Sequence, residues 1–206
     1  MKVLLVNGSP HKEGCTYTAL TEVAKMLNSE GIETEIFYAG QTKGGCMGCG
    51  YCYKEGKCVN NTDGVNEIIA RLDEFDGFVF GSPVHYASAS GAITSFMDRL
   101  FYAGGKNLKY KPGAVIASAR RGGTTATLDQ LTKHLTISNM PVVSSSYWNM
   151  VHGSSPQDVL KDEEGIQTMH NLGKNMAWLL KCIELGKNNG VPHPTPQSGS
   201  RTNFIR

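Results

Sequence analysis

Short apolar runs alternate along the chain with longer segments in which apolar residues recur every three or four positions. The short runs have the length and composition of buried strands, and we expect strands at 3–6, 33–38, 77–80, 114–118 and 141–145. The longer segments have helical periodicity, and we expect helices at 16–29, 63–72, 89–101, 124–136 and 156–184. This alternation predicts an α/β fold with a parallel sheet and helices on both faces.

The length of 206 residues fits one domain with a sizeable core. We expect residues 1–186 to form a flavodoxin-like three-layer sandwich with a five-stranded parallel sheet, into which a Cys-rich loop, 39–60, is inserted after the second strand. Residues 187–206 are rich in Gly, Pro, Asn and Ser and should form an extended C-terminal arm. The arm ends near an apolar pair, Phe204-Ile205, and is either a frayed tail or a segment that packs on a neighbouring subunit.

The charge pattern narrows the choice of partners. The chain has 20 Lys and Arg against 18 Asp and Glu, a formal net charge of +2, and no block of like charges. No nucleic-acid partner is expected, because phosphate backbones require a clustered basic face. We find neither a signal peptide nor an apolar stretch long enough to span a membrane, so we expect no membrane association and a cytoplasmic location.

The loop after the first expected strand carries a phosphate-binding pattern. Ser9, Thr16 and Thr18 lie near two glycines, where a strand passes into a helix N-terminus. Hydroxyls and free backbone N–H groups at such a point can bind one terminal phosphate. The spacing is neither Gly-x-Gly-x-x-Gly nor Gly-Lys-Ser/Thr, so a mononucleotide is favoured over a dinucleotide or triphosphate. The alternative is an ordinary turn with Thr16 as the helix cap.

Two further loops follow strands that should end at the same edge of the sheet. Residues 81–91 contain few charges, a stiffening Pro83, and His85-Tyr86 at the expected tip. Such a loop suits a flat aromatic ligand that stacks on one side and receives backbone hydrogen bonds at its edge. Residues 118–125 are rich in Gly, Ser and Thr. Ligands of doubly wound sheets bind beyond the carboxyl ends of the strands, so we expect these loops to form one site.

Two motifs resemble the flavodoxin-like NAD(P)H-dependent FMN reductases. The first is Gly-Ser-Pro with Gly-x-Thr at 8–16, and the second is Gly-Ser-Pro-Val-x-Tyr, Ser-Gly and Phe-Met-Asp-Arg at 81–99. The resemblance runs over most of residues 1–185. It implies an FMN cofactor, NAD(P)H as co-substrate, and transfer of electrons to a small-molecule or protein acceptor.

The resemblance also implies which residues bind FMN. The phosphate would be held by Ser9, His11, Thr16 and Tyr17; the ring would be lined by Pro83, Val84, His85 and Tyr86; the third loop, with Ser118, Arg120, Gly122 and Gly123, would close over its other edge. Cys15 stands where the family often has Asn. A thiol at a helix N-terminus can become reactive, but a bound phosphate opposes ionisation, so we expect a packed, inert thiol.

In hydride transfer the flavin itself accepts the hydride, and no side chain has to act as acid or base. We therefore name no certain catalytic residue. Arg120 or Arg121 is a candidate source of positive field near the flavin, or of a contact to an NADPH phosphate; the alternative is a solvated arginine pair. His85 is a candidate proton donor to a reduced acceptor, or a residue that lines the ring.

Four of the six cysteines are clustered, as Cys46, Cys49, Cys52 and Cys58. The spacing Cys-x2-Cys-x2-Cys-x5-Cys, with glycines between, allows four thiolates to converge. It resembles the motif of the iron-sulfur flavoproteins, which implies a [4Fe-4S] cluster. Structural zinc and a metal-free loop of thiols are the alternatives. We expect Cys182 to be a core residue.

Together these patterns predict an FMN-dependent NAD(P)H oxidoreductase of the flavin or quinone reductase type, working by a ping-pong mechanism. We expect a homodimer or homotetramer, because the exposed face of the flavin needs a second wall. One alternative is an iron-sulfur flavoprotein that acts as an electron carrier without NAD(P)H activity of its own. The other is a zinc-stabilised binding module.

Overall fold

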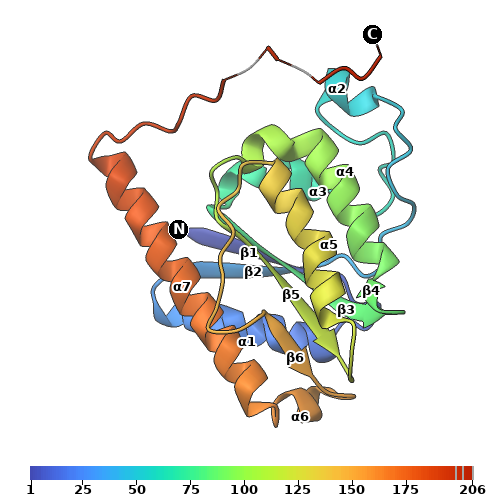
Figure 1. Cartoon of the computed structure of the whole chain (residues 1–206), viewed down its shortest axis with the longest axis vertical. Coiled ribbons are helices and arrows are strands. Elements are labelled where there is room, and N and C mark those ends of the chain that lie inside the picture. Colours follow the sequence, from blue (N-terminus) through green and yellow to red (C-terminus); the bar gives the residue numbers. More distant parts are fainter. Residues whose placement is uncertain (198, 201, 206) are drawn as a thin grey trace.

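A computed structural model of the protein describes residues 1–197, 199–200 and 202–205 (Figure 1). Its described residues form a sheet with the order β2-β1-β3-β5-β6, and all neighbours on this path are parallel. The short strand β4 pairs with the end of β3 in the antiparallel sense. The predicted α/β fold with a five-stranded parallel sheet is confirmed. The strands are β1 (Lys2–Asn7), β2 (Glu33–Tyr38), β3 (Gly77–His85), β4 (Ser88–Ala89), β5 (Gly113–Ala119) and β6 (Met150–His152).

Helices cover both faces of the sheet, which makes three layers (Figure 1). The long helices α1 (Cys15–Ser29) and α7 (Glu163–Asn188) pack against each other and against one face. The opposite face is covered by α3 (Val65–Ala70), α4 (Gly91–Leu108) and α5 (Thr124–Ile137). Alternate side chains of the central strands contribute to the two cores, as in β1, where Leu4 faces one core and Leu5 the other. Burial on both faces explains the unbroken apolar run of that strand.

The fifth strand was predicted at the wrong place. Only Val142 of the segment 141–145 forms a bridge, with Gly113 at the start of β5. The chain then leaves the sheet and returns as β6, which pairs with the last three residues of β5. Asn149 accounts for the return, because its carbonyl accepts the Ala117 N–H at 2.9 Å and its amide donates to the Val115 carbonyl at 3.1 Å. The edge of the sheet next to β5 is therefore formed by two pieces, Val142 and β6, and the residues between them lie outside the sheet.

The helix predicted at 156–184 is two helices, α6 (Pro156–Val159) and α7. Asp162 separates them, because its side chain accepts the Gly165 N–H and so caps α7. The segment 63–72 is also interrupted, since α3 ends at Ala70 and a short 3₁₀ turn, Leu72–Glu74, follows. Helix α4 begins at Gly91 and runs to Leu108, past the predicted end. Within the Cys-rich loop a short helix, α2 (Tyr51–Glu55), was not predicted.

After α7, the described residues from 191 onward have no regular secondary structure. The start of this arm contacts its own subunit, since Tyr110 donates its hydroxyl to the Pro194 carbonyl at 2.8 Å and stacks on His193. Phe204 and Ile205 are exposed by 92% and 87%. Packing of the arm on a neighbouring subunit therefore stays a prediction, as do the predicted domain boundaries. No helix in the described part of the chain is long and apolar enough to cross a membrane.

The outer strand β2 is fastened by a forked ion pair that gives a pH-dependent contribution to stability. Arg71 donates to both carboxylate oxygens of Glu35, at 2.9 and 2.8 Å, and Lys2 lies 2.9 Å away. Hydrogen bonding from Arg71, offset in part by burial and reinforced by Lys2, lowers the pKa of Glu35 from 4.5 to about 2.

We expect Glu35→Gln to lower the free energy of unfolding by about 1 kcal/mol at neutral pH, because the pair is partly exposed but bidentate. Since the folded-state pKa is depressed, this contribution is present above the unfolded pKa and disappears as pH falls toward about 2. Urea unfolding of both proteins over a pH series measures it. A difference that stays constant across the series would contradict this assignment.

Candidate functional site

The loops that follow β1, β3 and β5 meet at the carboxyl edge of the sheet, as predicted from the topology. Ser90 ties two of them together: its hydroxyl donates to the Gly8 carbonyl at 2.7 Å, and its N–H donates to the Ser82 hydroxyl at 2.9 Å. Gly8 permits this approach, because an added Cβ would lie 2.4 Å from the Cβ of Ile93. The first and second loops are therefore positioned relative to each other before any ligand binds.

The N-terminus of α1 faces this edge without a side-chain cap. Gly14 is the N-cap residue and can supply no side-chain acceptor, so the backbone N–H groups of the first turn have no capping side chain. The alternative in which Thr16 caps the helix is wrong. Thr16 lies inside the first turn, nearly fully buried, and its hydroxyl is 2.8 Å from that of Ser118 after β5. One of these two hydroxyls donates its proton to the other, so the proton of the second hydroxyl remains available to a ligand.

The other predicted phosphate residues surround the same helix end. Ser9 is buried and accepts the His11 N–H at 3.1 Å, while His11 itself is exposed and Tyr17 is half-buried. An open groove of about 670 Å³ lies beside this helix end, lined by residues 10–15, by Tyr38 and Gln41, and by residues 154–156; of the predicted phosphate residues it includes His11 but not Ser9, Thr16 or Tyr17. The positive end of the α1 dipole and this groove together make a suitable seat for an anion.

Cys15 is half-buried at the start of α1, and its thiol lies 3.7 Å from the Gly153 carbonyl. Burial raises the pKa of this thiol, and the nearby Asp158 adds to that effect. A thiol that resists ionisation is a poor nucleophile. The structure therefore places Cys15 as a packing residue in the wall of the anion seat.

The second loop is more ordered than the sequence suggested. Strand β3 continues to His85 and returns through β4, so that Val84 pairs with Ala89 and His85 with Ser88. The two residues of the turn, Tyr86 and Ala87, have φ of 47° and 61°. This is the left-handed conformation of a type I′ turn, which glycine and asparagine adopt readily and other residues do not. Pro83 and Val84 are half-buried at the base of the hairpin, while His85 and Tyr86 are exposed at its tip.

We expect Ala87→Gly to raise the free energy of unfolding by about 0.5–1 kcal/mol. The substitution relieves left-handed strain of about 1–2 kcal/mol, partly offset by the greater entropy of glycine in the unfolded chain. Ala126→Gly, at an exposed position of α5, is the matched control and should destabilise by about 1 kcal/mol. Chemical denaturation measures both. Equal losses in the two variants would show that the turn carries no such strain.

The third loop completes the rim of the site. Arg120, Arg121 and Gly122 are exposed. Gly123 lies against the hairpin, since an added Cβ would be 2.6 Å from the Cα of Ala87. The loop after β5 and the tip of the β3–β4 hairpin are thus in contact. The structure brings all three predicted loops together, with the arginines at the outer edge.

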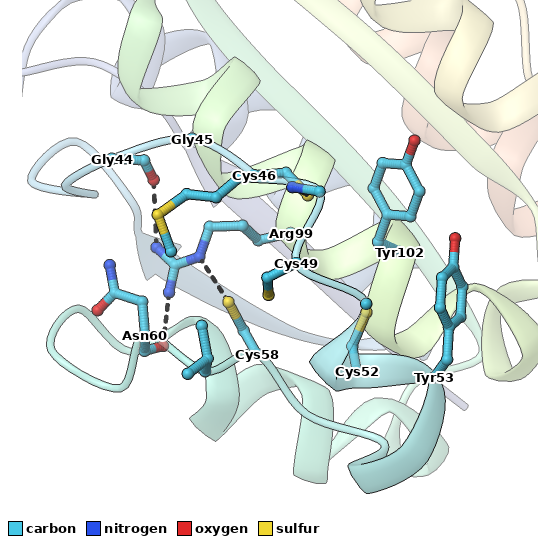
Figure 2. Close-up of a pocket in the computed structure, with 14 residues that line it drawn as sticks. Gly44, Gly45, Cys46, Cys49, Cys52, Tyr53, Cys58, Asn60, Arg99 and Tyr102 are labelled. Atoms are coloured by element: carbon cyan, nitrogen blue, oxygen red, sulfur yellow. Dashed lines mark hydrogen bonds between the residues drawn. The ribbon is translucent and has the colours of Figure 1, made fainter.

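The four clustered cysteines line one separate cavity of about 350 Å³ beside α4 (Figure 2). Cys46 and Cys49 are exposed, whereas Cys52 and Cys58 are half-buried. The Gly48 N–H points at the Cys46 sulfur at 3.5 Å, which the left-handed conformation of Gly48 allows. Burial raises the pKa of Cys52, and the other three thiols add to the shift, so the four influence one another. Within the described residues, no three potential ligands lie close enough to hold one metal ion.

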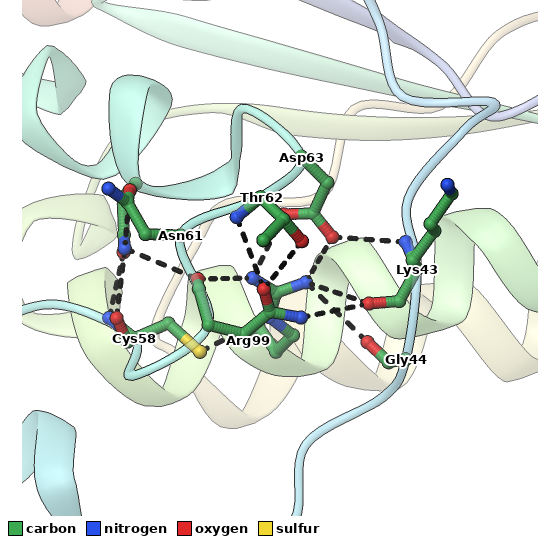
Figure 3. A network of polar contacts seen from close by, with 9 residues as sticks. Lys43, Gly44, Cys58, Asn61, Thr62, Asp63 and Arg99 are labelled. Atoms are coloured by element: carbon green, nitrogen blue, oxygen red, sulfur yellow. Dashed lines mark hydrogen bonds and ion pairs between the residues drawn. The ribbon is translucent and has the colours of Figure 1, made fainter.

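Arg99 lines this cavity and forms a buried ion pair with Asp63 behind it (Figure 3). Arg99 of α4 donates from its two terminal nitrogens to the Asp63 carboxylate, at 2.5 and 2.9 Å, and the two side chains are 0% and 3% exposed. Although burial alone raises the pKa of Asp63, the hydrogen bonds from Arg99 and from the Lys43 N–H hold it below its usual range. The Nε of Arg99 donates to the sulfur of Cys58 at 3.2 Å.

Sequence reasoning missed this pair and the type I′ turn. A signal for Arg99 was present, because it lies between Phe96 and Leu100 on the apolar stripe of α4, where an unpaired charge would be costly. Its partner was not predictable, because Asp63 is 36 residues away and precedes α3. The expectation for Cys182 is wrong, since this residue is exposed on α7.

Comparison with known proteins adds to this geometry. Residues 1–155 match the family described as NADPH-dependent FMN reductase. An iron-sulfur flavoprotein of Methanocaldococcus jannaschii is 36% identical over 193 residues, which cover 89% of this chain and 100% of that one. An iron-sulfur flavoprotein of Clostridioides difficile is 36% identical over 102 residues, covering 48% of this chain and 45% of that one.

Solved structures resemble the fold at low sequence identity. A flavodoxin from the domain Archaea has a TM-score of 0.61 at 16% identity, covering 88% of this chain and 99% of that chain. A structure titled NADH:FMN oxidoreductase has a TM-score of 0.63 at 16% identity, covering 86% and 88%. These matches establish a flavodoxin-like fold.

Proposed function

The chain belongs to the NADPH-dependent FMN reductase family, and from that premise we propose that it takes electrons from NADPH or NADH and passes them through FMN to an acceptor. The family and the similarity to iron-sulfur flavoproteins support a flavoprotein oxidoreductase. The observation that carries the proposal is the meeting of an uncapped helix N-terminus, a buried hydroxyl pair and a β-hairpin at one edge of the sheet.

The residues at this edge fit FMN in chemical terms. The first turn of α1 and the hydroxyl pair of Thr16 and Ser118 would hold the phosphate, because they offer N–H and O–H donors without a competing cap. Pro83 and Val84 would line the ring, and Gly123 keeps the third loop in contact with the hairpin. When bound, FMN supplies a ring that accepts hydride at N5. The protein's own tasks are to orient that ring and to exclude water from it.

The exposed groups on the rim are suited to the second substrate. Arg120 and Arg121 are exposed on the third loop, so either can bind a phosphate of a nicotinamide nucleotide. His85 lies at the exposed end of β3 and can hold or donate a proton to an acceptor docked there. We assign these as binding and proton-handling roles, since the hydride itself moves between nicotinamide and flavin.

For the cysteine cavity we propose a [4Fe-4S] cluster, which when bound transfers one electron at a time. Four thiols face one cavity of about 350 Å³, which fits a group larger than one atom. A single zinc ion would require four sulfurs about 2.3 Å from one centre, whereas the relatives that match most of this chain are named iron-sulfur flavoproteins, which favours the cluster. Cys46, Cys49, Cys52 and Cys58 would be the ligands.

We also propose a homodimer or homotetramer. The tip of the β3–β4 hairpin exposes Tyr86 completely, and the described end of the chain exposes Phe204 and Ile205. A neighbouring subunit that covered the hairpin tip would supply the second wall of the flavin site, and Phe204 and Ile205 would pack on a separate part of it. Light scattering of the purified protein that gave only a monomer would contradict this arrangement.

The test of the function is anaerobic stopped-flow spectroscopy of the purified holoprotein. Rapid bleaching of bound flavin by NADPH or NADH, followed by reoxidation by an acceptor such as a quinone, is the expected result. Protein that takes up no FMN would contradict the flavin site itself. Flavin that binds but stays oxidised with both nucleotides would support the second candidate, an iron-sulfur electron carrier without NAD(P)H activity, which the four-cysteine cavity favours.

A further inference from the structure

Arg99 is the most deeply buried charged residue beside the cysteine cavity, and every nitrogen of its guanidinium has an acceptor. Its residue exposure is 1%. The terminal nitrogens bind Asp63, and one of them also donates to the Asn60 carbonyl at 2.7 Å. The remaining nitrogen, Nε, donates to the sulfur of Cys58. A buried guanidinium with this bonding is fixed in position.

The same side chain gathers both ends of the Cys-rich loop. The carbonyls of Lys43 and Gly44, before the first cysteine, lie 3.5 Å from Nη1, and the Asn60 carbonyl follows the last cysteine. Asp63 reinforces this closure by accepting the Lys43 N–H at 3.0 Å (Figure 3). The loop is therefore closed around the ion pair, which explains why both charges remain buried.

The Arg99–Asp63 pair has no net charge, but only its positive member contacts the sulfur of Cys58. Asp63 binds the two terminal nitrogens, whereas the nitrogen nearest the side-chain stem donates to Cys58 (Figure 3). The sulfur thus contacts the positive member of the pair directly and the negative member only through it. Hydrogen bonds and net charge around ligand sulfurs set the reduction potential of iron-sulfur clusters.

We propose that Arg99 is a positioning residue that raises the reduction potential of the cluster held at Cys58, and that Asp63 moderates this effect. The inference rests on the cluster assigned under the proposed function. Arg99 stabilises the more negative, reduced form more than the oxidised form, because its N–H and positive charge face the ligand sulfur. Asp63 opposes that stabilisation with its own charge.

Two variants separate this role from a structural one, because they should move the potential in opposite directions. Asp63→Asn removes the moderating charge and should raise the ratio of reduced to oxidised cluster at a fixed applied potential about tenfold, or about 59 mV for one electron. The double variant Arg99→Met/Asp63→Asn removes both charges and the N–H donor together, so that no uncompensated charge stays buried. It should lower the ratio roughly threefold or more. Lys106→Met, which removes an exposed charge two turns further along α4, is the control and should change nothing.

The measurement is an anaerobic redox titration of the full-length protein, followed by the electron paramagnetic resonance signal of the reduced cluster, with iron and sulfide determined for each variant. Opposite shifts support the proposal. Equal potentials, or shifts in one direction, in variants that keep their iron would overturn it. If the double variant holds no iron, Arg99→Gln/Asp63→Asn, whose amide can still donate to sulfur, should recover it; loss of iron in both would assign Arg99 a structural role only. Wild-type protein that holds no cluster would instead refute the proposed function.

Discussion

Replacement of Gly40 by alanine is expected to weaken FMN binding roughly hundredfold or more, which corresponds to losing two charge-assisted hydrogen bonds of about 1.5–3 kcal/mol each. Gly40 follows β2 and presses against the first loop. A Cβ there would lie 1.8 Å from the Ser9 carbonyl oxygen and 2.6 Å from the Tyr38 ring. Because the Ser9 contact is with backbone, relief requires displacement of the loop that carries the phosphate donors.

Fluorescence titration of flavin-free protein with FMN measures this effect. Gly105→Ala, on α4, is the matched control, because an added Cβ there meets nothing within 4 Å. It should bind FMN normally and gain about 0.5–1 kcal/mol of stability. If Gly40→Ala bound FMN as tightly as the control, the phosphate would not lie at the first loop.

Replacement of Cys49 by serine is expected to remove most of the iron and sulfide while leaving FMN content unchanged. Cys49 lines the cavity beside α4 and lies apart from the loops at the sheet edge. A hydroxyl is a much poorer ligand for iron than a thiolate, so the proposed cluster would lose one of its four attachments. Metal and sulfide analysis of anaerobically purified protein, beside the flavin spectrum, tests both halves of this expectation.

Cys182→Ser is the control for general effects of cysteine loss, since this residue is exposed on α7. It should retain iron, sulfide and FMN. Full iron and sulfide content in Cys49→Ser would remove this residue from the ligand set. Simultaneous loss of FMN would show that the two sites are not separate.

The extent to which the sequence predicted the fold depended on burial. Strand β2 was predicted with both of its ends, and β1 was found because residues 3–6 are buried on both faces. The fifth strand was misplaced because residues 141–145 are as apolar as a strand, yet only Val142 pairs. The pairing of β6 depends on hydrogen bonds of Asn149 to β5, which no local pattern reveals.

For the candidate site, the sequence predicted which loops meet but not which side chains bond to one another. The loops were predictable, because parallel strands fix which turns share an edge. The roles of individual residues were harder to predict. Threonine is a common helix cap, but Thr16 instead bonds to Ser118, which is 102 residues away. Arg99 and Asp63 were missed for a similar reason, since an ion pair between distant segments leaves no periodic signal.

Helix α4 carries Ser90 at its N-cap, beside the flavin loops, and Arg99 in the wall of the cysteine cavity. They are nine residue steps apart on the helix, about 14 Å along its axis. Ser90 and Arg99 are both held by buried hydrogen bonds of the chain itself, so α4 fixes the distance between the two sites without a cofactor taking part. We therefore expect FMN and the proposed cluster to load in either order.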